Sequence, residues 1–549
     1  MTAASARTFG LAGLTGLLFP LCFPDFNLGW LAWAALVPLH FALDDTATRR
    51  ALWLGWLAGF LASAGIMSWV VTAMHQYGKM PLIASYPVMW LLAAYLGLYM
   101  GLYAAGFAWL AHRMPAWAPL GAPCLWVALE LVRTHLLSGL PWMLLGYSQY
   151  QWLPIIQIAD LTSVYGVSFL IVLVNVALAE VLLWAWRRFR LRQARAFPWP
   201  APTAASLFLI ASLAYGQAAL SNETRTEGQP SLAIGLVQPN VDQTQKWDQA
   251  YRRETLDRYA RLTAQAAKDV DLLLWPEAAT PFLFEDEPVY RVEVAVLVYR
   301  HGVPLLFGSP ALRRYPNGRP YLLNSAYLLS PDGRIVGRYD KRHLVPFGEY
   351  IPLHSSILFF LDKLVEGIGD FEAGTEATVF TPAVRPGTPQ PNIGVVICYE
   401  VIFPDLVREF VAHGAIVMTT ITNDAWFGNS SAPSQHFAMV VFRAVENRVA
   451  FARSANTGIS GLIDPSGRIL LSTPIFTELA VSGRIPLRRT LTFYTRYGDV
   501  FAYACVIITA LLGIVADWRR SHARRIARAR QGDRGAGPRT PGASLTSHA

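Results

Sequence analysis

The chain has few charged residues. Asp, Glu, Lys and Arg make up 15% of its 549 residues, and hydrophobic residues make up 53%. Soluble globular proteins carry roughly 25% charged residues. The composition therefore argues against a wholly soluble protein and in favour of a membrane protein. The net charge of +9 comes largely from arginine clusters beside apolar segments, so it does not indicate a nucleic-acid partner.

Cysteine is also scarce, with four residues in the whole chain. Cys22, Cys124 and Cys505 lie inside apolar segments, where a small packing residue is the ordinary interpretation. This number and placement exclude a disulfide framework. No His or Cys pair has metal-site spacing, and there is no P-loop or dinucleotide fingerprint, so we expect no metal and no cofactor.

Long apolar segments are abundant. A helix of roughly 20 apolar residues crosses the hydrocarbon core of a bilayer, which is about 30 Å thick. Such segments predict about eight transmembrane helices, near residues 9–24, 28–43, 52–74, 89–110, 120–137, 164–186, 203–220 and 500–516.

Basic residues beside these segments predict the orientation, because short cytoplasmic loops carry an excess of Lys and Arg. Arg49 and Arg50, Arg113, and a cluster that begins at Arg187 all fall on one side, as do the arginines after residue 518. We therefore expect cytoplasmic termini, a membrane domain of seven helices in 1–220, an extracytoplasmic domain in 221–497, a last transmembrane helix in 498–518 and a basic, disordered tail in 519–549.

Residues 221–497 show a different pattern. Short runs such as "SLAIGLVQ", "DLLLWPE", "VPLLFGS", "GVVICYE" and "AIVMTTITN" are rich in β-branched and aliphatic residues and end at Gly, Pro, Asn or Asp, as strands do. Helical patterns lie between several of them, at 251–267, 404–412 and 435–448. The alternation predicts an α/β layered domain.

Polar residues end two of these predicted strands, where side chains leave the packed layer of a sheet. Glu277 ends "DLLLWPE" and Cys398 ends "GVVICYE", while "YDKRHLVPFGEY" contributes Lys341 and Glu349. A cysteine nucleophile needs a base to take its proton, and a lysine can stabilise the oxyanion that follows. Taken singly, Cys398 could be a buried packing residue, and Glu277 and Lys341 solvated charges.

Together these residues resemble the Glu, Lys and Cys triad of the nitrilase superfamily, whose domain is an αββα sandwich. With "FGEYIP", "ITNDAWFG", "ARSANTGISG" and "GLPWMLLGYSQ", the chain resembles the membrane-bound branch, the apolipoprotein N-acyltransferases of the bacterial inner membrane. The resemblance implies that an acyl chain passes from the sn-1 position of a phospholipid, preferably phosphatidylethanolamine, through a cysteine thioester to the α-amine of a diacylated apolipoprotein, with the catalytic domain on the periplasmic side.

The resemblance also assigns residues. Glu277 is the base, Lys341 the oxyanion donor and Cys398 the nucleophile, and Glu349 and Glu400 support the site. Two further candidates for the site are Trp247, which the resemblance associates with substrate access, and Tyr399. For both residues, ordinary packing within the fold is the competing interpretation.

Two other functions stay open. A membrane-anchored nitrilase-type amidase would use the same triad, with water resolving the thioester. A transporter with a ligand-binding outer domain is less compatible with the few charges in the apolar segments. Glu130 and Arg133, inside one such segment, form either an i, i+3 ion pair or a contact to a lipid head group.

Overall fold

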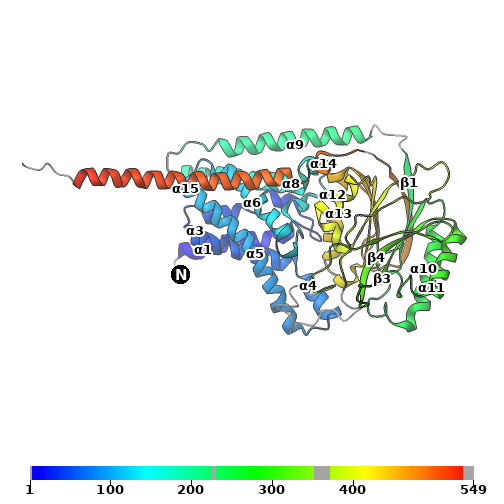
Figure 1. Ribbon diagram of the computed structural model, residues 1–549. Coiled ribbons are helices and arrows are strands. Elements are labelled where there is room, and N and C mark those ends of the chain that lie inside the picture. Colours follow the sequence, from blue (N-terminus) through cyan, green and yellow to red (C-terminus); the bar gives the residue numbers. More distant parts are fainter. Residues whose placement is uncertain (1–2, 225–229, 351–370, 489, 536–549) are drawn as a thin grey trace, which may run out of the picture.

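The computed structural model describes residues 3–224, 230–350, 371–488 and 490–535. One half of the molecule is a bundle of helices from the first 224 residues together with the last helix, and the other half contains two β-sheets with covering helices (Figure 1).

The helical half is built from long apolar helices joined by short ones. Its α-helices are α1 (Ala3–Leu21), α2 (Val37–Leu43), α3 (Thr48–Ile66), α4 (Trp69–Thr72), α5 (Leu82–Arg113), α6 (Ala118–His135), α7 (Leu153–Ile156), α8 (Ala159–Phe189), α9 (Pro200–Thr224) and α15 (Val500–Gly535). Shorter turns of 3-10 or π type are η1 (Gly29–Trp33), η2 (Ala73–Tyr77), η3 (Leu136–Ser138) and η4 (Leu145–Gln149).

The predicted number of eight spans is not confirmed. Over the described residues, five helices are long and apolar enough to cross a membrane, or six if the bent pair Thr48–Ile66 and Trp69–Tyr77 is one span. The predicted segment 28–43 is instead a broken, shorter element, Gly29–Leu43, in which η1 and α2 are separate. The helix α1 in the first predicted segment is not among the five.

The other half holds two six-stranded sheets. The first has the order β12-β1-β2-β3-β4-β5 and the second β11-β10-β9-β8-β7-β6. The strands of the first sheet are β1 (Ser231–Gln238), β2 (Leu272–Leu274), β3 (Leu305–Arg314), β4 (Pro320–Leu329), β5 (Ile335–Asp340) and β12 (Leu479–Pro486). Those of the second are β6 (Val379–Phe380), β7 (Ile393–Ile397), β8 (Val417–Thr422), β9 (Ala450–Ala455), β10 (Gly461–Ile463) and β11 (Ile469–Ser472).

Helices cover the two outer faces, so the layers are helix, sheet, sheet, helix. On the first sheet lie α10 (Arg252–Ala266) and α11 (Pro288–His301), at the end of the molecule farthest from the bundle (Figure 1). On the second lie α12 (Pro404–Ala412) and α13 (Ala432–Asn447), followed later in the chain by α14 (Phe493–Tyr497). Contacts between β1 and β9 join the sheets. This architecture confirms the predicted nitrilase-like α/β fold.

The parallel core of the second sheet explains its composition. Strands β7, β8 and β9 run parallel and are buried along their whole length. A parallel strand that is covered on both faces reads as a continuous apolar run rather than an alternating one. The run "GVVI" that precedes Cys398 is therefore an interior strand of the sheet, and Cys398 directly follows its C-terminal end.

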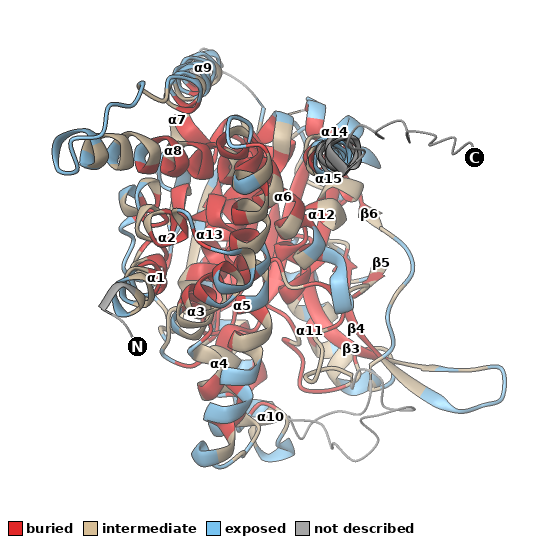
Figure 2. Cartoon of the chain, turned by 90° about the vertical axis from the view of Figure 1, so that its left-hand side faces the viewer, coloured by how far each residue is buried: buried red, intermediate tan, exposed pale blue. Residues whose placement is uncertain are grey.

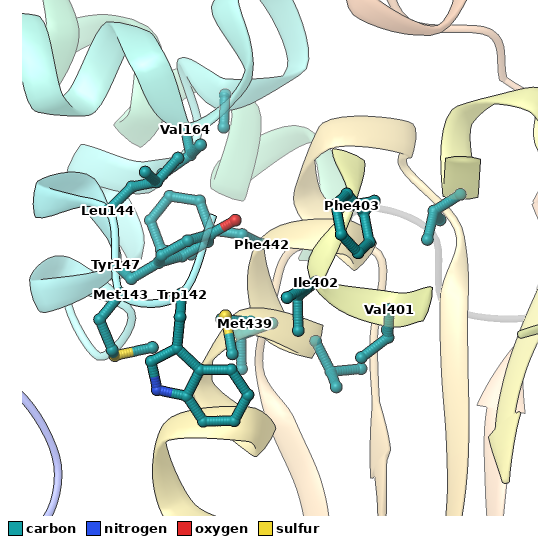
Figure 3. Packing of buried hydrophobic residues seen from close by; sticks show 14 of the residues in the cluster. Trp142, Met143, Leu144, Tyr147, Val164, Val401, Ile402, Phe403, Met439 and Phe442 are labelled. Carbon is teal, nitrogen blue, oxygen red and sulfur yellow. The ribbon is translucent and has the colours of Figure 1, made fainter. Parts of the chain in front are cut away.

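The two halves share one continuous core. Trp142, Met143 and Tyr147 of the helical half lie beside Met439 and Phe442 of α13, and Ile402 and Phe403, which follow β7, belong to the same buried cluster (Figure 3). Polar contacts reinforce this apolar interface, since Arg448 at the end of α13 pairs with Asp160 of α8 at 2.8 Å. Because the second sheet faces the bundle through α12 and α13, the end of β7 lies near the helical half.

The last helix is longer than predicted. Residues 519–549 were expected to be disordered, but α15 continues to Gly535. The segment 519–530 is rich in Arg and Ala, which are favourable helix formers. Residues 536–549 lie outside the described residues. Figure 2 shows that α9 is largely exposed at the edge of the bundle.

Candidate active site

Cys398 stands where β7 turns into the short helix η6 (Cys398–Ile402). Its φ angle is +52° and it is 8% exposed. Non-glycine residues adopt this left-handed conformation infrequently, and such strain collects at functional sites, where the surrounding structure enforces it. The turn presents the thiol at the strand end rather than in the packed layer.

Glu277 follows β2 on the opposite sheet and is also buried. Its Oε1 accepts a hydrogen bond from Asn324 Nδ2 at 2.7 Å, and its Oε2 accepts one from the backbone N–H of Asn423 at 2.9 Å. A glycine permits this position, because a Cβ on Gly308 would lie 2.5 Å from the nitrogen of Ala278. The carboxylate is thus fixed by two donors and by the close approach of β3.

Lys341 comes directly after β5 and is 1% exposed. Its Nζ lies 2.9 Å from both carboxylate oxygens of Glu349 and 3.6 Å from Oε1 of Glu277. Burial alone would lower the pKa of Lys341, but the nearby carboxylates of Glu349 and Glu277 outweigh it and raise that pKa above its usual value. The ammonium group therefore stays charged.

The thiol of Cys398 lies within the field of both groups. Burial and the negative charge of Glu277 raise the pKa of Cys398, while the positive charge of Lys341 partly opposes them. The resting residue is therefore a thiol, and it becomes a nucleophile only when a base takes its proton. A carboxylate and an ammonium group that both act on one thiol can supply the base and the oxyanion stabilisation of acyl transfer.

Glu400 joins the two loops of the site. Its Oε1 accepts hydrogen bonds from Tyr339 Oη at 2.7 Å and from the backbone N–H of Arg342 at 2.7 Å, and its Oε2 accepts one from the backbone N–H of Ile397 at 2.7 Å. Burial raises the pKa of this carboxyl group. Glu400 thus ties the residue before the cysteine to the residue after Lys341.

Tyr399 reaches the helical half. Its Oη donates a hydrogen bond to the carbonyl oxygen of Gly139, 3.1 Å away in the loop after α6. Trp247, in contrast, is half-buried and follows Lys246 in the loop after β1. Of the predicted supporting residues, Glu349 contacts Lys341 itself, and Glu400 contacts the loop that follows Lys341. Tyr399 connects the turn at Cys398 to the helical half.

Several residues around the site were not predicted. Asn324 of β4 donates hydrogen bonds to both Glu277 and Glu349 through one Nδ2 atom, at 2.7 and 2.8 Å. Lys246 is buried, and its Nζ lies 3.1 Å from the carbonyl oxygen of Glu277. Burial lowers the pKa of Lys246 to about 8, although the charge of Glu277 opposes that shift. The sequence offers one signal for each of these residues. Asn324 is a polar residue within the run "LNSAYLLS", and Lys246 stands beside Trp247.

A buried polar network lies behind the cysteine. The Nε2 atom of His436, on α13, lies 3.2 Å from the carbonyl oxygen of Cys398, so this nitrogen carries a proton. Burial and the charge of Arg453 lower the pKa of His436, and a neutral ring can then accept at Nδ1 from Arg453, 3.1 Å away. Asp424 pairs with Arg453 at 2.7 Å. The network fixes the carbonyl group of the strained residue.

Among the residues that the structure describes, no group of three or more His, Cys, Asp or Glu side chains could hold a metal ion.

Comparisons with known proteins match both halves of the chain. Residues 15–177 match the family described as apolipoprotein N-acyltransferase N-terminal domain, and residues 233–490 match the carbon-nitrogen hydrolase family. The apolipoprotein N-acyltransferase of Geobacter metallireducens is 43% identical over 524 residues, which cover 94% of this chain and 97% of the relative. That of Chlorobaculum tepidum is 33% identical over 540 residues, with coverage of 94% and 97%.

Among solved structures, the chain is similar to Nit3 of Saccharomyces cerevisiae, a member of the nitrilase superfamily, with a TM-score of 0.36 and 20% identity over 47% of this chain and 90% of that one. The matches to the curated relatives extend over nearly the whole sequence and include both halves of the fold. The chain belongs to the apolipoprotein N-acyltransferase family.

Proposed function

We propose that the protein transfers an acyl chain from the sn-1 position of a phospholipid, preferably phosphatidylethanolamine, to the N-terminal α-amine of diacylglyceryl-cysteine in apolipoproteins. The reaction has two halves that share Cys398. The catalytic domain stands on the periplasmic side of the bacterial inner membrane, with both termini in the cytoplasm.

In the first half, Glu277 takes the thiol proton and the sulfur attacks the ester carbonyl carbon. The carbonyl oxygen becomes an anion, which the ammonium group of Lys341 stabilises. The C–S bond forms, the ester C–O bond breaks, and Glu277 returns the proton to the departing lysophospholipid alkoxide. The product is a thioester on Cys398.

In the second half, the α-amine of the acceptor attacks the thioester carbonyl. The C–N bond forms and the C–S bond breaks, and Glu277 takes the proton that the amine loses and returns it to the sulfur. Glu349 and Asn324 hold Lys341 and Glu277 in position through the contacts described above. Glu400 holds the loop that carries Lys341 next to the turn that carries Cys398. Trp247 lies beside the path by which substrates enter.

The observation that carries this proposal is the placement of the thiol. Cys398 is buried within electrostatic range of a carboxylate and an ammonium group, and the adjacent Tyr399 contacts a loop of the helical half at 3.1 Å. Both substrates have acyl chains in the bilayer and reacting groups at its surface, so a nucleophile at this boundary can reach them. A water-poor site also favours an amine over water as the second nucleophile, because orientation outweighs abundance.

The test is the intact mass of the purified protein after incubation with phospholipid alone. We expect one added acyl group that persists, and no steady release of fatty acid. A diacylated lipopeptide with a free α-amine should then discharge the adduct into an amide, and the same peptide acetylated at that amine should leave it unchanged. Continuous fatty-acid release at the same rate with and without the lipopeptide would instead identify an amidase-type hydrolase.

A further inference from the structure

Arg133, in the helical half, has a buried side-chain nitrogen without a hydrogen-bond partner. It lies in the last turn of α6, at the end of that helix nearest the catalytic half. Within the described part of the chain it forms no salt bridge. Its Nη2 donates to the carbonyl oxygen of Trp142 at 3.0 Å, while its buried Nε atom has no hydrogen-bond partner. Most of the hydrogen-bonding capacity of this cation is therefore unused.

The i, i+3 ion pair with Glu130, one of the two sequence interpretations, is not formed. The Oε1 of Glu130 instead accepts hydrogen bonds from Trp126 Nε1 at 2.9 Å and from the backbone N–H of Leu145 at 2.8 Å. The other carboxylate oxygen is buried and has no partner among the described residues. Charged side chains in a membrane segment are costly and usually mark a functional site.

Both residues line one cavity of about 60 Å³ between α3, α5 and α6. Ser63, Tyr99 and Trp142 contribute to its wall. A water molecule needs roughly 10 to 15 Å³ of such volume, so the space suits a group of about the size of a phosphate. Trp142 forms part of the wall, and its ring packs against that of His436 with centroids 5.7 Å apart. His436 in turn contacts the carbonyl group of Cys398.

We propose that this cavity binds the head group of the donor phospholipid, with Arg133 on the phosphate and Glu130 facing the ammonium of a zwitterionic head group. The inference rests on the proposed function and adds a recognition site to it. A guanidinium group presents several N–H donors in a plane that matches phosphate oxygens. Trp142 in the wall of the cavity is connected to Cys398 through His436, so a phospholipid whose phosphate is held there can bring its ester toward the thiol.

The test compares two phospholipids that differ in their head group with a donor that carries no phosphate. Acyl-adduct formation is followed by intact mass with phosphatidylethanolamine, with phosphatidylglycerol and with the p-nitrophenyl ester of the same fatty acid, which carries no phosphate. In Arg133→Gln, we expect at least a tenfold rise in the phospholipid concentration that gives half-maximal rate, and no change with the p-nitrophenyl ester. Arg133→Lys should recover part of the loss because it keeps the charge. Glu130→Gln should weaken use of phosphatidylethanolamine alone.

Arg113→Gln, at the last residue of α5, is the matched control and should behave as the wild type. Equal loss with all three donors in Arg133→Gln would show a general structural defect and overturn the proposal, as would no loss at all. If inorganic phosphate slows the wild-type reaction with the p-nitrophenyl ester but leaves Arg133→Gln unaffected, the site takes free phosphate and the lipid assignment is wrong. Failure of the wild type to form any adduct would refute the proposed function itself.

Discussion

At the scale of single residues, the site depends on a buried thiol that is protonated at rest. Removing the proposed base should therefore slow the first chemical step. Glu277→Gln keeps the size of the side chain and can still accept from Asn324, but it cannot take a proton. We expect adduct formation to fall by about 10² or more, measured by intact mass over time with phospholipid.

Lys341→Met, which keeps the length of the side chain without its charge, is the companion variant and should show a similar loss. Cys398→Ala should form no adduct while it keeps the fold, since the change leaves a small cavity at a strand end. Normal thioester formation in Glu277→Gln, with failure only at transfer to the amine, would contradict the role of Glu277 in the first half.

Lys246 gives the site a pH-dependent stability. Its pKa in the folded protein is about 8, below the value of about 10.4 in an unfolded chain. Between these two values the unfolded state binds more protons, so stability rises with pH. The destabilisation from this buried cation is fully present below about pH 8 and is lost as the pH rises toward about 10.

The measurement is the melting temperature of the purified protein in detergent at pH 7.5 and 9.5, for the wild type and for Lys246→Met. The wild type should gain relative to the variant as the pH rises, because the variant lacks the titrating group. A constant difference between the two proteins across this range would show that Lys246 does not titrate there.

The residues that the sequence could and could not indicate differ in kind. Glu277 and Cys398 end apolar runs, so their position at the C-terminal ends of strands follows from local pattern. The structure places Glu277 beside Lys341 at 3.6 Å. Asn324 and Lys246 reach the same place through tertiary contacts. Asn324 is one polar residue in a strand, and nothing local distinguishes it from an ordinary strand residue. The catalytic roles themselves stay predictions.

At the scale of elements, the turn after β7 is attached to the loop after α6 by the Tyr399 hydroxyl. Tyr399→Phe removes one hydrogen bond, which contributes about 1 kcal/mol, and leaves the ring packed against Phe403. We expect about a fivefold slower adduct formation with phospholipid and an unchanged fold by circular dichroism. Tyr399→Ala, which also removes the buried ring, should lower the melting temperature substantially.

An unchanged rate in Tyr399→Phe would show that the hydroxyl contact between the two halves is dispensable for positioning the cysteine.

Elements with strong local patterns were predicted well, and membrane segments less well. The helix predicted at 404–412 matches α12, and the five quoted apolar runs correspond to strands β1, β2, β3, β7 and β8. The segment 28–43 misled because composition alone does not reveal a break between η1 and α2, with Pro38 starting the second helix. The described length of α15 exceeded the expectation because arginine favours helices even outside a membrane.

At the scale of the whole molecule, orientation can be tested directly. Between Arg49 and the catalytic domain lie four helices that are long and apolar enough to cross a membrane, α5, α6, α8 and α9, and the bent pair Thr48–Ile66 and Trp69–Tyr77. If the bent pair is one span, these make five crossings, and the catalytic domain lies on the side opposite Arg49. A membrane-impermeant thiol reagent should label a cysteine introduced at Asn222 in intact cells and spare one at Ser544. Labelling at Ser544 from outside would contradict the arginine-based orientation.

The pairing of β1 with β12 affects how the protein is made. The two strands are antiparallel neighbours from Ser231 and Pro486 to Gln238 and Leu479, about 250 residues apart in the sequence. At a synthesis rate of 5 to 20 residues per second, β1 waits about 10 to 50 s for its partner. During that interval one edge of the strand has unpaired backbone groups, which invite pairing with other chains. A chain that ends before residue 479 therefore keeps one edge of β1 open to pairing with other chains, and the edge closes only when the last strand has been made.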